Sequence, residues 1–164
     1  TAWLRYYLYS RNAQKMSEYF HALRSASENS NAPNELKSGE ARNIDRGGTR
    51  ISYFFLKENY DSILAYGHRR YHTAEVAIAL MKTGKINEAN LIVDSLRMAS
   101  EMDNAFPIGI IYGWLGEKQK AMKYLNLAYR LYDYSLINIK VNKLFDPLRS
   151  EKEFRNLLSK MGIE

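Results

Sequence analysis

The sequence predicts an all-α protein built from helical hairpins, and three observations support that class. Residues that favour helices are plentiful, whereas proline occurs only three times in 164 residues. No segment keeps the strict polar–apolar alternation of a half-buried strand. Finally, Gly84-Lys-Ile-Asn-Glu-Ala89 recurs 32 residues later as Gly116-Glu-Lys-Gln-Lys-Ala121, and each copy stands between two amphipathic stretches of helical length.

Composition excludes several classes of protein. The chain has no cysteine, so disulfides and thiolate metal sites are ruled out. No apolar run approaches the roughly 20 residues that span a bilayer. The net charge is +6, but the densest basic cluster, His68-Arg69-Arg70, holds two fixed charges, and nucleic acid is not an expected partner. Because the chain begins with Thr1 rather than Met, we expect a piece of a longer cytoplasmic protein, or a periplasmic one if a membrane helix precedes it.

We expect the whole chain, residues 1–164, to form a single helical-repeat domain. Its N-terminal part is divided into three segments. Apolar residues spaced by three and four make 1–27 a degenerate hairpin. Residues 28–48 are rich in Ser, Asn and Gly and are predicted to form a long surface loop. Residues 49–69 are expected to form irregular short helices.

The clear repeats follow at 70–103 and 102–135. The first helix of each repeat is predicted to end at Gly84 or Gly116, where glycine tolerates the left-handed conformation that closes a helix. Asn87 is the predicted N-cap of the helix that follows Gly84.

These residues resemble the tetratricopeptide repeat (TPR) family. Small residues at fixed positions let the two helices of a hairpin approach, and one aromatic residue fills the space between neighbouring hairpins. The packing residues so assigned are Ala77, Gly84 and Ala89 in the first copy, and Gly109, Tyr112, Gly116, Ala121 and Ala128 in the second. The first copy carries Leu80 and Leu96 at the other two signature positions, and neither copy ends in the proline of the pattern. The resemblance implies a right-handed solenoid of antiparallel helix pairs.

Residues 136–164 are predicted to close the solenoid. Leu144-Phe-Asp-Pro-Leu-Arg-Ser-Glu-Lys-Glu-Phe154 resembles the closing segment of bacterial TPR regions that follow a winged-helix, cyclase or kinase module. Ser150 and Glu153 fit a capping box that begins a helix at 151–161. We expect this helix to cap the open end of the core.

No pattern in the chain predicts catalysis, a metal site or a cofactor. His68 and His72 are four residues apart, but no third ligand cluster accompanies them, and surface histidines are the simpler interpretation. Gly47-Gly48 lacks the strand and the Lys-Ser/Thr ending of a phosphate loop. Four of the 13 tyrosines fall within 124–134, where packing or protein contact explains them better than base stacking.

The TPR resemblance also implies a ligand groove on the first helices of the repeats. The residues at those signature positions are Tyr71, Glu75, Ile78, Met81, Lys82, Asp103, Phe106, Ile110 and Trp114. An apolar groove with a few charges suits a peptide or helix. It is equally open from the sequence that the N-terminal hairpins or the 28–48 loop fill this groove.

We therefore expect a non-enzymatic TPR-like interaction module, the C-terminal sensory or scaffolding region of a larger bacterial signalling or regulatory protein. Its partner would be a protein, a peptide or another domain of the same chain. Two alternatives stay open: a homodimerisation module, and a small-molecule sensor with a closed pocket.

Overall fold

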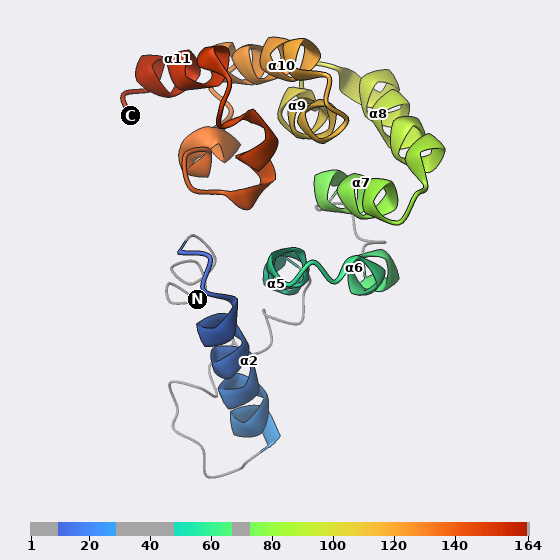
Figure 1. Ribbon diagram of the computed structural model, residues 1–164, viewed down its shortest axis with the longest axis vertical. Coiled ribbons are helices and arrows are strands. Elements are labelled where there is room, and N and C mark those ends of the chain that lie inside the picture. The colour runs from blue at the N-terminus through green and yellow to red at the C-terminus, as the bar shows by residue number, and fades with distance from the viewer. Residues whose placement is uncertain (1–9, 29–47, 67–72, 164) are drawn as a thin grey trace. The chain divides into compact units, whose positions relative to one another are not determined.

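The computed structural model describes residues 10–28, 48–66 and 73–163, and each element within these ranges is a helix (Figure 1). The predicted all-α class is confirmed for this part of the chain. The chain divides into two compact units, residues 1–72 and residues 73–164.

The N-terminal unit has three described helices: α2 (Ala13–Glu28), α5 (Gly48–Leu56) and α6 (Tyr60–Tyr66). Asn12 caps α2, because its side-chain Oδ1 accepts a hydrogen bond of 2.9 Å from the Lys15 amide. The Tyr53 hydroxyl on α5 donates to Ser17 Oγ on α2 at 3.1 Å. The buried apolar side chains are Met16, Ile51, Phe55 and Ile63. Most of the predicted 28–48 loop and the first part of the predicted 1–27 hairpin lie outside the described residues.

The C-terminal unit is a series of helices in two layers. Its elements are α7 (Thr73–Lys82), α8 (Ile86–Ser100), α9 (Ala105–Trp114), α10 (Lys118–Arg130), the 3-10 helices η1 (Tyr134–Asn138) and η2 (Lys143–Leu148), and α11 (Lys152–Lys160). Figure 1 shows α8, α10 and α11 following one another along one side, with α7, α9 and the η1–η2 segment along the other. Two pairs of consecutive helices, α7–α8 and α9–α10, are each packed together, and α7 packs against α9.

The two pairs share one turn geometry. Gly84 has φ of +82° and Gly116 has φ of +80°, so the predicted left-handed end of each first helix is confirmed. The amide after each glycine bonds back across the turn, Lys85 to the Leu80 carbonyl at 2.8 Å and Glu117 to that of Tyr112 at 3.0 Å. This is the Schellman arrangement, which satisfies carbonyl groups at a helix end.

Helix α9 is the centre of the unit. It packs against α7, α8, α10 and η2 and is apolar on nearly every side, as expected of a helix with several neighbours. A Cβ atom added at Gly109 would lie 2.9 Å from Leu125 Cγ and 3.2 Å from the Ala121 carbonyl oxygen. The absence of a side chain at Gly109 therefore sets how closely α9 approaches α10.

Two predicted caps are wrong. Asn87 is not an N-cap, because only three residues join α7 to α8 and the chain passes from the turn at Gly84 into α8 with Lys85 at the N-cap position. At α11 the N-cap is Glu151 rather than Ser150, since the turn that ends η2 continues to Ser150 and leaves Glu151 as the extended residue. Neither residue at these N-cap positions makes a side-chain capping bond.

Candidate functional site

The residues that the TPR resemblance assigns to a ligand groove differ in accessibility. Ile78 and Ile110 are buried, with exposed fractions of 0% and 1%. The half-buried residues are Glu75, Met81, Phe106 and Trp114, and the exposed ones are Lys82 and Asp103. Tyr71 lies outside the described residues.

One contact joins the first helices of the two hairpins directly. The Lys82 Nζ atom of α7 lies 5.2 Å from the centroid of a ring of Trp114 on α9. A cation at this distance from an aromatic face is attracted by the electron density of the ring. The accessible residues that the resemblance assigns to α7 and α9 are here called the α7–α9 face, which consists of Glu75, Met81, Lys82, Phe106 and Trp114.

The sequence did not predict that the segment after η1 would cover part of α9. Trp114 Nε1 donates a hydrogen bond of 2.8 Å to the Leu144 carbonyl oxygen. The rings of Phe106 and Phe145 meet edge to face at 5.7 Å, and a Cβ atom added at Gly113 would lie 3.2 Å from Leu148. Residues 143–148 therefore pack directly on α9. The apolar residues of η2 were visible in the sequence, but a search for α-helical spacing does not detect 3-10 helices.

On the opposite layer, a polar contact links the neighbouring hairpins. The buried Tyr124 of α10 donates its hydroxyl to the carboxylate of Glu101, which follows α8. Burial, followed by this hydrogen bond, raises the pKa of Tyr124 to about 12, and the same bond lowers the pKa of Glu101. Tyr112 of α9 stacks on Tyr124 at 5.6 Å, and Arg97 lies 3.7 Å from Glu101. Tyr112 therefore contacts Tyr124, and Tyr124 in turn bonds to Glu101 beside the preceding helix, α8.

The other residues assigned to repeat packing are placed as follows. Ala77, Ala89, Gly109, Ala121 and Ala128 are buried, and Tyr112 is 9% exposed. Gly84 and Gly116 are exposed and serve the turns.

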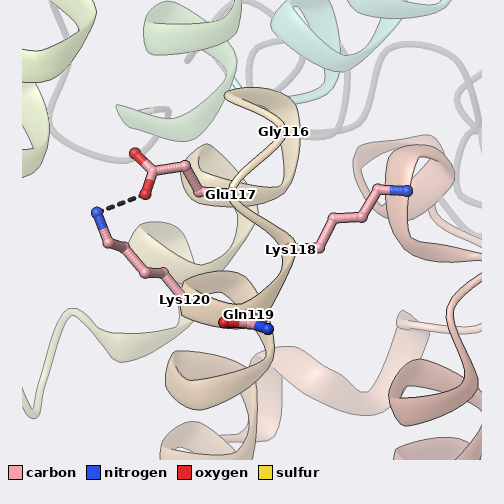
Figure 2. A pocket seen from close by; sticks show the side chains of 5 residues that line it. All are labelled: Gly116, Glu117, Lys118, Gln119 and Lys120. Atoms are coloured by element: carbon pink, nitrogen blue, oxygen red, sulfur yellow. Dashed lines mark ion pairs between the residues drawn. The ribbon is translucent and has the colours of Figure 1, made fainter.

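A polar hollow lies at the start of α10. It measures about 330 Å³ and is lined by Gly116, Glu117, Lys118, Gln119 and Lys120 (Figure 2). Figure 2 shows the two lysines extending in different directions, Lys120 toward Glu117 and Lys118 away from it. Lys118 Nζ instead lies 2.5 Å from Glu151 Oε1. Both lysines are thus paired with carboxylates of this chain. The hollow therefore does not bring together side chains suited to catalysis.

Within the described ranges no three His, Cys, Asp or Glu side chains gather in a way that could hold a metal ion. His68 and His72 fall outside those ranges. None of the described helices combines the length and the apolar character needed to cross a membrane. Comparisons with protein-family models, with curated proteins and with solved structures gave no match to this chain.

Proposed function

We propose that this chain is a non-enzymatic, TPR-like helical-repeat module that binds a peptide or helix on its α7–α9 face. The bound segment belongs to a partner protein or to another domain of the same chain. One observation carries the proposal: two hairpins with the same turn geometry are stacked so that their first helices, α7 and α9, lie against each other. Adjacent first helices are how repeat proteins build an extended binding surface.

The composition of the α7–α9 face supports this function. Met81, Phe106 and Trp114 offer partly exposed apolar and aromatic area, and such residues are enriched where proteins bind one another. Methionine adapts its shape to different ligands, and tryptophan often anchors interfaces. Lys82 adds a positive charge beside Trp114. The face therefore suits an apolar segment that carries a carboxylate.

We further propose, from the resemblance of the 144–162 stretch, that the module is the C-terminal sensory or scaffolding region of a bacterial signalling or regulatory protein in the cytoplasm. The amphipathic helix α11 is consistent with a closing element. It buries Phe154 and Leu157 and exposes its charged residues. Capping repeats with a polar outer face keep such arrays from associating end to end.

Site-specific photocross-linking tests the binding face. A benzoylphenylalanine at Met81, on the α7–α9 face, is expected to cross-link to a discrete protein in a lysate of the source organism. The matched control is the same group at Asn90, which is exposed on α8. Equal labelling from both positions, or none from position 81, would contradict the proposed binding face.

A second candidate function is self-association through α8. Leu91 and Met98 are 64% and 88% exposed, and their spacing of seven residues places them on one side of the helix. Met102, in the turn that follows, is 57% exposed. Sedimentation at several concentrations tests this candidate: a concentration-dependent dimer that Met98→Glu abolishes supports it, and a monomer at every concentration rules it out.

A further inference from the structure

The segment that joins α10 to η2 carries several exposed large apolar side chains, none of which belongs to the α7–α9 face. We call this set the tyrosine patch, and it consists of Leu131, Tyr132, Tyr134, Ile137 and Val141. The exposed fractions of Tyr132, Tyr134 and Ile137 are 94%, 88% and 75%. Residues three apart share one side of a 3-10 helix, so Tyr134 and Ile137 project together from η1.

The other side of the same segment is firmly packed. Leu136 and Ile139 are 3% and 0% exposed, so this stretch is anchored in the core of the unit. The tyrosine patch is therefore the outward side of an ordered segment rather than a loose loop. Large apolar side chains gathered on an ordered surface mark interaction sites.

The backbone at Tyr132 is unusual. Tyr132 has φ of +55° and closes α10, with the Asp133 amide bonded to the Ala128 carbonyl at 3.0 Å. The equivalent position is glycine at the ends of α7, α9 and α11, namely Gly84, Gly116 and Gly162. A side chain in this conformation costs about 1–2 kcal/mol that glycine avoids. A strained, exposed aromatic residue is a feature that functional sites concentrate.

The charge around the patch indicates the chemistry of the partner. Residues 118–143 contain six Lys or Arg and a single acidic residue, Asp133. In the sequence beside the patch residues, Arg130, Lys140 and Lys143 outnumber Asp133. In a symmetric dimer the patch would meet its own copy and place like charges together, which is unfavourable. An acidic partner is complementary in charge to these basic residues.

We propose that the tyrosine patch is a docking surface for an acidic amphipathic peptide segment of a partner protein, separate from any ligand of the α7–α9 face. The apolar side chains of the bound peptide pack on Tyr132, Tyr134 and Ile137. The carboxylates of the peptide face Arg130 and the lysines that follow η1, Lys140 and Lys143. Aromatic residues with a polar tip suit this task because they bury area with little loss of side-chain freedom.

The test is selection of a random twelve-residue peptide library, displayed on phage, against the immobilised full chain. We expect the enriched peptides to combine Asp or Glu with large apolar residues. Measured by fluorescence anisotropy, their binding should weaken at least about tenfold in a Tyr134→Ser/Ile137→Ser variant and should also weaken as salt is raised. Lys82→Glu, on the α7–α9 face, is the matched control and should leave the affinity unchanged.

A further pair of variants separates docking from folding. Tyr132→Gly relieves the left-handed strain, so it should raise the melting temperature while weakening peptide binding severalfold. Glu58→Gly relieves the same conformation (φ +55°) in the N-terminal unit and should leave binding unchanged.

The proposal would be overturned if no peptide were enriched, if the enriched peptides were basic, or if they bound the Tyr134→Ser/Ile137→Ser variant as tightly as the parent protein. A concentration-dependent dimer that this variant abolishes would also overturn it, because the occupant would then be a second copy. Peptides sensitive only to Lys82→Glu would support the α7–α9 face and refute the tyrosine patch.

Discussion

Gly109→Ala tests how closely the two helices of the second hairpin are packed. The new Cβ would lie 2.9 Å from Leu125 Cγ, 3.0 Å from Leu125 Cδ2 and 3.2 Å from the Ala121 carbonyl oxygen. The contact with Leu125 is below 3.0 Å, so that side chain must be displaced, and the carbonyl belongs to the backbone of α10, which cannot shift without disturbing the hairpin. Overpacking of this kind costs about 1–3 kcal/mol.

Alanine also favours the helix over glycine by about 1 kcal/mol, which offsets part of the strain. With strain at the middle of its range, about 2 kcal/mol, the expected net loss in the free energy of unfolding is therefore about 1 kcal/mol. Gly113→Ala is the matched control on the same helix. The three atoms nearest its Cβ all belong to the Leu148 side chain, at 3.2–3.4 Å, so a shift of a few tenths of an ångström in that side chain would relieve these contacts. We expect Gly113→Ala to lie within about 0.5 kcal/mol of the parent protein, since the helix gain offsets this strain.

The assay is urea unfolding followed by tryptophan fluorescence. The chain has two tryptophans, so a Trp3→Phe background leaves Trp114 as the reporter of the C-terminal unit. For a slope of about 2 kcal/mol/M, Gly109→Ala should lower the urea midpoint by about 0.5 M at an unchanged slope. If Gly109→Ala is as stable as Gly113→Ala, close packing of α9 on α10 is not what glycine serves at this position.

Three further predictions concern the turns, Tyr124 and Trp114. Gly84→Ala and Gly116→Ala should each cost about 1–2 kcal/mol by the same unfolding assay and by equal amounts, because both glycines have φ near +80° and open space around Cβ; unequal losses would argue against equivalent turns. Tyr124 has a pKa of about 12 against an ordinary 10, so the stabilisation by its neutral phenol is complete below pH 10 and is lost as pH rises toward 12. Tyr124→Phe should remove most of this alkaline loss of stability, and a Tyr124→Phe profile between pH 9 and about 12 that matches the parent protein would contradict the assignment. Trp114→Phe leaves the Leu144 carbonyl without its donor and should destabilise the unit by about 1–3 kcal/mol in thermal unfolding followed by circular dichroism, whereas a neutral result would mean that this bond is dispensable.

Much of the C-terminal unit was predictable because its turns require a residue type that can be recognised in the sequence. A left-handed helix end favours glycine. Gly84 and Gly116 therefore indicated where α7 and α9 end, and their separation indicated that the two helix pairs repeat at a fixed spacing. The packing of η2 on α9 was not predictable from spacing, because 3-10 helices are short and the contacts of Leu144 and Phe145 join distant parts of the chain. The left-handed Tyr132 was also missed, since a tyrosine gives no local indication of that backbone conformation.

The candidate site was predictable only in part. The signature positions of α7 and α9 come from the repeat pattern, but their accessibility depends on tertiary neighbours. Ile78 and Ile110 are buried, whereas Lys82 and Trp114 meet on an accessible face. Burial of this kind depends on which elements pack together, and the spacing of apolar residues alone does not determine it.

The most direct test of the account is the fluorescence of Trp114 during binding, in the Trp3→Phe background. A partner identified by cross-linking from position 81, added to the full chain, should shift Trp114 emission to shorter wavelength and protect it from iodide quenching. Lys82→Glu should weaken both effects. If the partner binds, as shown by its own labelled signal, while Trp114 emission and quenching stay unchanged, binding does not take place on the α7–α9 face.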